Sequence, residues 1–349
     1  MPIVWVTGGA GFIGSHLVRH LVHTQPNWHI VTIDALTYAG NLANLADLKD
    51  APNHTFLRVN IADGPAVEKA WEAYPPDRIL HLAAESHVDR SILSPLDFVH
   101  TNVLGTVTLL EMARKHWKGR TDVLFYQVST DEVYGSLAPE DFFREGSSYD
   151  PRSPYSASKA AADHFVRAYG HTYGIPYLIS NCGNNYGPYQ FPEKLIPLTI
   201  THLMERKPIP VYGTGQNVRD WIYVEDHVRA IALLAEKGQR GHTYLIGARC
   251  PRPNLEIVTL LCDLYDELTG ARDSRQLITF VKDRPGHDFR YAIEPSPELH
   301  ALGWQPQVSL HEGLRKTLHW YLQNQAWVNA VRSGEYQSYY ALQYGERLR

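Results

Sequence analysis

The chain alternates short apolar runs with amphipathic stretches, most regularly in its first half. Runs rich in β-branched and aromatic residues predict buried strands at residues 3–6, 30–33, 56–59, 78–82 and 123–128. Apolar residues recur at helical spacing in residues 11–22, 98–116, 155–173, 224–236 and 254–269. This alternation predicts an α/β fold in which helices cover both faces of a parallel sheet. Ligands of such folds bind beyond the carboxyl ends of the strands.

The pattern changes in the second half of the chain. Proline and glycine cluster in residues 186–192 and 207–215. We therefore predict a first domain of residues 1–183 and a smaller α/β substrate domain formed mainly by residues 184–349. Segments from about 217–248 are expected to return to the sheet.

Composition and charge narrow the classes of function. The 349 residues include 33 Lys and Arg against 37 Asp and Glu, so no basic surface for nucleic acid or a membrane is expected. No secretory signal is evident, and no apolar run is long enough to span a bilayer. The three cysteines and the 18 histidines show no metal-ligand spacing. We expect a cytoplasmic protein without a bound metal.

A glycine-rich turn follows the first predicted strand and opens a helix. Gly8, Gly11 and Gly14 are spaced three apart, which lets the backbone approach a pyrophosphate at a helix N-terminus. Asp34 ends the next strand, twenty residues after Gly14, the spacing of a carboxylate that binds the adenosine ribose. Because this carboxylate would repel a 2′-phosphate, the pattern predicts a Rossmann-type domain that binds NAD rather than NADP.

A tyrosine and a lysine begin a later predicted helix. Tyr155 and Lys159 are four residues apart and therefore share a helix face. Alone, they could equally be a surface pair, but Thr130 just beyond the fifth strand completes a hydride-transfer site of hydroxyl, phenol and ammonium. Lowering a tyrosine pKa from about 10 to about 7 needs roughly 4 kcal/mol. One ammonium about 4 Å away supplies about that much at an effective dielectric near 20.

Longer motifs give the chain a family resemblance. With the glycine turn and the Tyr155/Lys159 pair, it resembles the extended short-chain dehydrogenase/reductases and, among these, the dTDP-glucose 4,6-dehydratases. The resemblance runs from residue 4 to about residue 327. The matching segments are residues 81–91, 129–135, 184–195, 219–221 and 283–287.

The resemblance implies a doubly wound fold and conversion of dTDP-glucose to dTDP-4-keto-6-deoxyglucose, as in the biosynthesis of rhamnose and other deoxysugars. The steps are C4 oxidation, loss of water across C5 and C6, and reduction at C6. Asp131 and Glu132 suit the elimination, because neighbouring carboxyls can split their pKa values into an acid and a base. Successive strand residues point to opposite faces, so both carboxyls can reach one sugar only if the strand has ended.

The resemblance also assigns individual residues and an assembly. The implied catalytic residues are Thr130, Asp131, Glu132, Tyr155 and Lys159. The cofactor-binding residues, counting the glycine turn and Asp34, are Gly8, Gly11, Phe12, Ile13, Gly14, Asp34, Ala35, Leu36, Thr37, Asn60, Ile61, Leu82, Ala83, Ala84, Glu85, Thr101, Tyr155, Lys159 and Asn185. The implied nucleotide-sugar contacts are Ser86, Thr130, Asn184, Lys194, Leu195, Pro210, Val211, Tyr212, Arg219, Asn254, Asp283, Arg284, Pro285, Gly286 and His287. A homodimer through two helices per subunit is expected, with residues 98–116 and 155–173 as candidates.

Two departures from the family pattern and two alternatives remain. Gly183 stands where the family usually has Ser, and Asn60 stands where Asp is common. One alternative is a 4,6-dehydratase of another nucleotide sugar, such as UDP-glucose. The other is a catalytically silent NAD-binding regulator, which would typically have lost Tyr155, Lys159 or the carboxyl pair.

Overall fold

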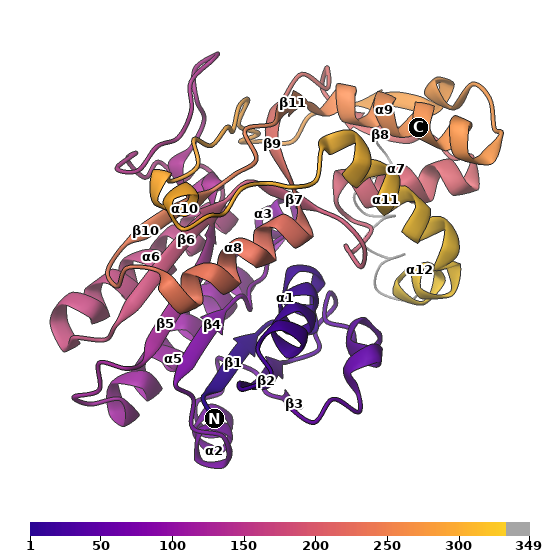
Figure 1. Cartoon of the computed structure of the whole chain (residues 1–349). Coiled ribbons are helices and arrows are strands. Elements are labelled where there is room, and N and C mark those ends of the chain that lie inside the picture. Colours follow the sequence, from indigo (N-terminus) through magenta and orange to yellow (C-terminus); the bar gives the residue numbers. More distant parts are fainter. Residues whose placement is uncertain (333–349) are drawn as a thin grey trace.

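A computed structural model, which describes residues 1–332, shows a large sheet of seven parallel strands (Figure 1). The strand order is β10-β6-β5-β4-β1-β2-β3, and it reverses between β1 and β4, where a ligand crevice is expected. The strands are β1 (Ile3–Thr7), β2 (His29–Asp34), β3 (His54–Arg58), β4 (Arg78–His81), β5 (Leu124–Thr130), β6 (Tyr177–Cys182) and β10 (Thr243–Ile246). The five strands predicted from the sequence are confirmed to within two residues.

Helices cover both faces of the sheet because alternate strand residues are buried on opposite sides. Val4 and Val6 of β1 share an apolar core with α1 and α8. Trp5, which lies between them, shares a second core with α2, α5 and α6. The helices are α1 (Phe12–Thr24), α2 (Gly64–Ala73), α5 (Gly105–His116), α6 (Pro154–Tyr173) and α8 (Val224–Lys237). The doubly wound Rossmann-type fold is thereby confirmed.

The predicted helix of residues 98–116 is not a uniform α-helix. It begins as the π-helical segment η2 and continues as α5, after two short helices. Such segments often occur at functional sites. Here the buried Asn102 donates from Nδ2 to the Glu85 carbonyl oxygen (2.9 Å) and accepts from the Glu85 N–H (2.8 Å). The elements are α3 (Val88–Leu93), α4 (Pro95–Phe98) and η2 (Val99–Leu104).

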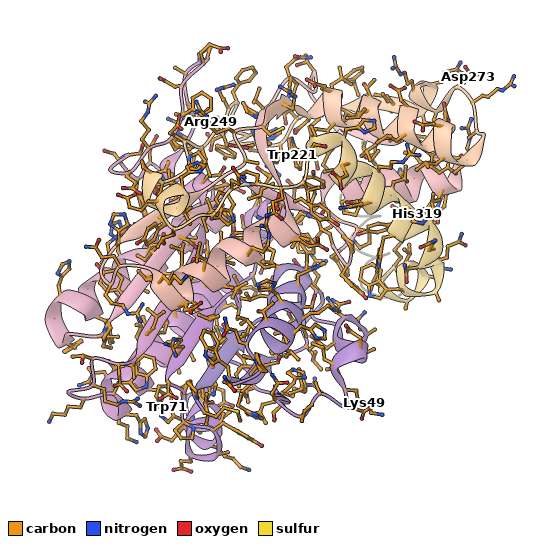
Figure 2. The ribbon with its side chains drawn as sticks, viewed as in Figure 1. Lys49, Trp71, Trp221, Arg249, Asp273 and His319 are labelled. Carbon is orange, nitrogen blue, oxygen red and sulfur yellow. The ribbon has the colours of Figure 1, made fainter. Side chains whose placement is uncertain are left out.

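A smaller lobe packs over one end of the sheet, at the upper right of Figure 1. It holds a three-stranded sheet, β11-β9-β7, a two-stranded sheet, β12-β8, and its own apolar core. Figure 2 shows Trp221 of β9 between the large sheet and this lobe, and Asp273 at the lobe's outer edge. The strands are β7 (Asn184–Tyr186), β8 (Ile209–Tyr212), β9 (Val218–Tyr223), β11 (Pro251–Pro253) and β12 (Ile278–Val281), and the helices are α7 (Leu195–Glu205), α9 (Asn254–Thr269), α11 (Leu310–Gln323) and α12 (Gln325–Val331).

The chain passes between the two parts more than once. β7 and β9 belong to the lobe, α8 packs against α1, and β10 returns to the large sheet before β11 and α9 rejoin the lobe. The short helix α10 (Pro297–Ala301) lies beyond them in sequence. Residues 333–349, at the end of the predicted second domain, lie outside the described residues. Within residues 1–332, none of the helices combines the length and the hydrophobicity needed to span a membrane.

Candidate active site

A cavity of about 440 Å³ lies at the carboxyl ends of the large sheet, beside the lobe. It brings together most of the residues predicted from the sequence. These are Gly8, Gly11, Phe12, Ile13, Gly14, Asp34, Ala35, Thr37, Asn60, Ile61, Leu82, Ala83, Ala84, Glu85, Ser86, Thr101, Thr130, Asp131, Glu132, Tyr155, Lys159, Asn184, Asn185, Lys194, Leu195, Tyr212, Arg219, Asn254, Arg284 and His287. The predicted residues that do not line it are Leu36, Pro210, Val211, Asp283, Pro285 and Gly286.

The glycine turn leaves no room for side chains at two of its positions. Gly8 has a φ of +69°, and a Cβ there would lie 2.8 Å from the Ala83 backbone. A Cβ on Gly14 would lie 2.1 Å from the Gly8 carbonyl oxygen. The helix that follows, α1, begins at Phe12, and its first residues, Phe12, Ile13 and Gly14, line the cavity. The first N–H groups of a helix have no partner within the helix. The backbone can therefore approach a pyrophosphate as a dinucleotide site requires.

Asp34 is held in place by the turn that it would serve. Its Oδ2 accepts from the Ala10 N–H (3.0 Å), and its Oδ1 accepts from the Leu36 N–H (2.8 Å). Burial raises the pKa of Asp34, and the two backbone bonds oppose that rise. A ribose hydroxyl could donate to the same carboxylate, so this part of the site fits NAD.

Asp131 and Glu132 lie just after a strand, so they are not forced to opposite faces of the sheet. β5 ends at Thr130, and residues 131–134 form a 3₁₀ turn, η3 (Asp131–Tyr134), closed by Gly135 at a φ of +76°. The Thr130 hydroxyl caps this turn by accepting from the Glu132 N–H at 3.3 Å. Both Asp131 and Glu132 line the cavity, so the condition set by strand alternation is met.

The surroundings of Asp131 and Glu132 affect the pKa values of the two carboxyls differently. Burial, and then the charge of Glu132, raise the pKa of Asp131 well above its usual range. Burial also raises the pKa of Glu132, but Arg284, Arg219 and Lys194 oppose that rise. The Asp131 Oδ2 is buried and has no hydrogen-bond partner among the described residues. These contacts favour Asp131 as the protonated group and Glu132 as the ionised one.

Tyr155 and Lys159 project from the first turns of α6. Ser153 caps this helix, and its exchange of hydrogen bonds with Ser156 fixes the helix start. The buried Lys159 ammonium donates to the Val128 carbonyl oxygen (2.8 Å). Burial lowers the pKa of Lys159, whereas the Asp163 carboxylate raises it.

The prediction that Lys159 lowers the pKa of Tyr155 is wrong when only the protein's own groups act on the phenol. Burial, and then the charge of Glu132, raise the pKa of the Tyr155 phenol well above 10, although a hydrogen bond from Thr130 opposes the rise. Desolvation of the buried phenolate outweighs the stabilisation expected from the Lys159 ammonium. Deprotonation of Tyr155 therefore needs further positive charge, and the nicotinamide ring of NAD⁺ is the cofactor group that carries it.

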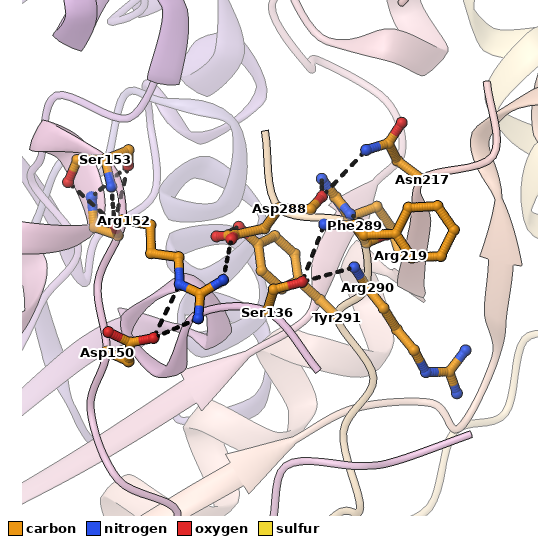
Figure 3. A network of polar contacts seen from close by, with 11 residues as sticks. Ser136, Asp150, Arg152, Ser153, Asn217, Arg219, Asp288, Phe289, Arg290 and Tyr291 are labelled. Carbon is orange, nitrogen blue, oxygen red and sulfur yellow. Dashed lines mark hydrogen bonds and ion pairs between the residues drawn. The ribbon is translucent and has the colours of Figure 1, made fainter. Parts of the chain in front are cut away.

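Three cationic side chains that belong to the lobe line the cavity. Lys194 donates from Nζ to the Ser86 carbonyl oxygen (2.6 Å). Arg284 pairs with the Asp89 carboxylate (3.3 Å). The guanidinium of Arg219, in the network of Figure 3, donates to the Asp288 carbonyl oxygen (3.0 Å). Its Cζ lies 4.2 Å from the centre of the Tyr291 ring. Together the three side chains form a positive surface that suits a diphosphate.

Sequence reasoning missed several residues that hold this site together. Asp89 accepts from the Tyr212 hydroxyl (3.0 Å) as well as from Arg284, and it lines the cavity. Asn102 fixes the backbone of Glu85. Asp89 lies within a matching segment and Asn102 follows Thr101, and these positions in the sequence were the available signal.

The two departures from the family pattern have local explanations. A Cβ on Gly183 would lie 2.7 Å from the Asp220 carbonyl oxygen, so glycine matches a close approach of β9. Asn60 accepts from the Ala62 N–H (3.0 Å) through Oδ1, a bond that an aspartate could also make.

The chain is similar to known proteins along its whole length. The family model for GDP-mannose 4,6 dehydratase matches residues 5–317. A probable dTDP-glucose 4,6-dehydratase of Sinorhizobium fredii is 52% identical over 351 residues, covering 99% of this chain and 98% of the relative. The dTDP-glucose 4,6-dehydratase of Salmonella typhimurium is 49% identical over 360 residues, covering 99% of each chain.

Solved structures lead to the same family. A crystal structure of a dTDP-glucose 4,6-dehydratase from Streptomyces venezuelae with NAD and TYD bound has a TM-score of 0.87 and 43% identity. The match covers 94% of this chain and 99% of that one. With its glycine turn, its Tyr155/Lys159 pair and its adjacent carboxyls in one cavity, this chain belongs to the dTDP-glucose 4,6-dehydratases of the extended short-chain dehydrogenase/reductase family.

Proposed function

We propose that the protein converts dTDP-glucose to dTDP-4-keto-6-deoxyglucose, a step in the formation of deoxysugars. The observation that carries the proposal is the pair Asp131 and Glu132, which share one turn and one cavity with Tyr155. NAD⁺, when bound, accepts a hydride from C4 of the sugar and supplies one to C6. Residues 1–183, with α8 and β10, would hold the cofactor, and the lobe would hold the nucleotide sugar.

The side chains would carry out the proton transfers of the three steps, and one molecule of water would leave. Tyr155, as phenolate, takes the proton of the C4 hydroxyl while Thr130 donates a hydrogen bond to the C4 oxygen. Lys159 holds the cofactor ribose through its ammonium. The C4 ketone acidifies C5, Glu132 removes the C5 proton, and Asp131 protonates the C6 oxygen as water leaves. Glu132 then returns a proton to C5 as C6 is reduced. Tyr155 releases its proton to solvent and Asp131 takes one up, which restores the phenolate and the protonated acid.

The cationic side chains would bind the diphosphate and position the sugar. Lys194, Arg219 and Arg284 come from three separate segments of the lobe, and each is fixed by a protein oxygen. Tyr212 is expected to contact the thymine ring.

The function is tested with dTDP-glucose in heavy water and no added NAD. We expect mass spectrometry of the sugar to show the loss of one water and the gain of one deuterium at C5. No added NAD is needed because retained NAD is regenerated in each turnover. UDP-glucose, assayed side by side, is expected to react more slowly. Faster turnover of UDP-glucose would favour the alternative substrate, and unchanged sugars after NAD is added would favour a silent NAD-binding protein.

We also propose a homodimer formed through α5 and α6. Five large apolar side chains, one on α6 and four on the segments α3, α4 and η2 that lead into α5, are 41% to 76% exposed, and exposed apolar side chains on neighbouring segments are typical of an interface. They are Leu93, Leu96, Val99, Leu104 and Phe165.

The three free cysteines are consistent with a reducing, cytoplasmic location.

The dimer is tested by charge at the proposed interface. Leu104→Glu combined with Phe165→Glu is expected to convert a dimer into a monomer in sedimentation velocity, because both charges would lose water on association. Phe280→Glu is the control, since Phe280 is 56% exposed on β12 in the lobe. A monomeric unsubstituted protein, or a dimeric double variant, would contradict the proposed interface.

A further inference from the structure

A buried carboxylate joins two loops that line the cavity from different parts of the chain. The Glu193 side chain is only 2% exposed and lies just before α7. Its Oε1 accepts from the Tyr38 hydroxyl (2.9 Å), and its Oε2 accepts from Arg90 Nε (3.2 Å). Tyr38 belongs to the loop after β2, and Arg90 belongs to α3. One carboxylate therefore connects three segments.

Further contacts make these three side chains a single packed unit. Arg90 Cζ lies 3.8 Å from the centre of the Tyr38 ring, so the cation also stacks on the aromatic face. The Tyr38 ring meets the Phe191 ring edge to face, with 5.4 Å between their centres. A buried carboxylate is costly unless it is paired, so loss of either partner would weaken the junction. We call Tyr38, Arg90 and Glu193 the clasp.

The clasp lies next to the part of the cavity where the cofactor is expected to bind. Thr37, Ala39 and Gly40, the neighbours of Tyr38, line the cavity close behind Asp34 in sequence. On the other side, Phe191 and Glu193 themselves line it. The clasp thus ties the loop expected at the adenosine ribose to the segment that carries Lys194.

We propose that the clasp retains NAD in the cavity, and that the cofactor leaves only when the bond between Tyr38 and Glu193 opens. The proposal rests on the proposed function, because a cofactor regenerated in every turnover gains from slow release. Tyr38, Arg90 and Glu193 are positioning residues in this role. They hold the two loops together and take no part in proton or hydride transfer.

The test measures NAD release from the holoenzyme, without sugar. Protein loaded with NAD is diluted into an excess of a fluorescent NAD analogue, and the NAD that remains bound is measured over time after desalting. Tyr38→Phe removes one hydrogen bond to a charged group, and we expect release about 10- to 100-fold faster. Glu193→Gln is expected to have at least as large an effect, because it also removes the charge that pairs with Arg90.

A matched variant and a double variant separate retention from general loosening. Tyr169→Phe removes a similar tyrosine hydroxyl, which donates to Glu111 Oε1 (2.5 Å) on α5 outside the cavity, and it should leave release unchanged. The double variant of Tyr38 and Glu193 should release NAD no faster than Glu193→Gln, because both changes break the same bond.

Three results would overturn the proposal. If both clasp variants release NAD at the rate of Tyr169→Phe, retention does not depend on the clasp, whereas the proposed function stands. If the two single effects multiply in the double variant, the residues do not act through one bond. If the unsubstituted protein binds no NAD at all, both the clasp and the proposed function fail.

Discussion

Replacing Tyr155 by phenylalanine is expected to slow C4 oxidation by about 10²- to 10⁴-fold, the usual contribution of a positioned acid or base. The phenol is buried in the cavity beside Thr130 and Glu132, and it is the residue proposed to take the C4 hydroxyl proton. Phenylalanine keeps the ring and its edge contact with Phe98. The variant should therefore fold and still bind NAD, so that the loss falls on the chemical step.

The measurement is single-turnover absorbance of the reduced cofactor after dTDP-glucose is mixed with the NAD-loaded enzyme. Tyr177→Phe is the matched control, because Tyr177, on β6, is buried in an apolar core and does not line the cavity. The control should oxidise the sugar at nearly the unsubstituted rate. An oxidation rate in Tyr155→Phe that equals the control would remove Tyr155 from the mechanism.

The pH dependence of this step follows from the same environment. Burial and the charge of Glu132 raise the pKa of Tyr155, so little of the phenol is ionised at pH values below that raised pKa. The phenolate fraction should increase as the pH rises toward it. The rate of C4 oxidation should therefore increase with pH until NAD-bound Tyr155 is fully ionised.

Local signals made part of the site predictable from the sequence. The spacing of Gly8, Gly11 and Gly14, and of Asp34 after them, is set within one βαβ unit, so the chain alone specifies their geometry. The position of Tyr155 and Lys159 on one helix face follows from their separation of four residues. β1, β2, β4 and β5 were recognisable because most of their residues are buried and read as apolar runs. β3 lies at the edge of the sheet and is only partly buried, so its signal was the short apolar run that contains Phe56 and Leu57.

The rest depends on contacts between segments far apart in the sequence. The partners of Asp89 include Arg284, 195 residues away, and Glu193 meets Tyr38 across 155 residues. The direction of the Tyr155 pKa shift follows from desolvation by the packed cavity, and no residue spacing reports that burial. The orientation of Asp131 and Glu132 was similarly open until β5 was seen to end at Thr130.

Replacing Asp131 by asparagine is expected to slow water loss by about 10²-fold or more, while C4 oxidation changes much less. Burial and the charge of Glu132 raise the pKa of Asp131, so its carboxyl keeps its proton to a higher pH than an exposed aspartic acid does. This proton is available as long as the pH stays below the raised pKa and is lost as the pH rises through it. Asparagine has nearly the same shape but cannot supply the proton to the departing C6 hydroxyl.

The two steps can be followed in one experiment with Asp131→Asn. Absorbance of the reduced cofactor should appear at close to the normal rate and then persist, because the sugar halts as a 4-ketone that still holds its C6 hydroxyl. Glu132→Gln is the comparison, since it removes the C5 base and should halt the reaction at the same point, with no deuterium entering C5. Equal slowing of oxidation and water loss in Asp131→Asn would show that Asp131 organises the cavity for both steps, and the general acid would then have to be sought elsewhere among the residues that line it.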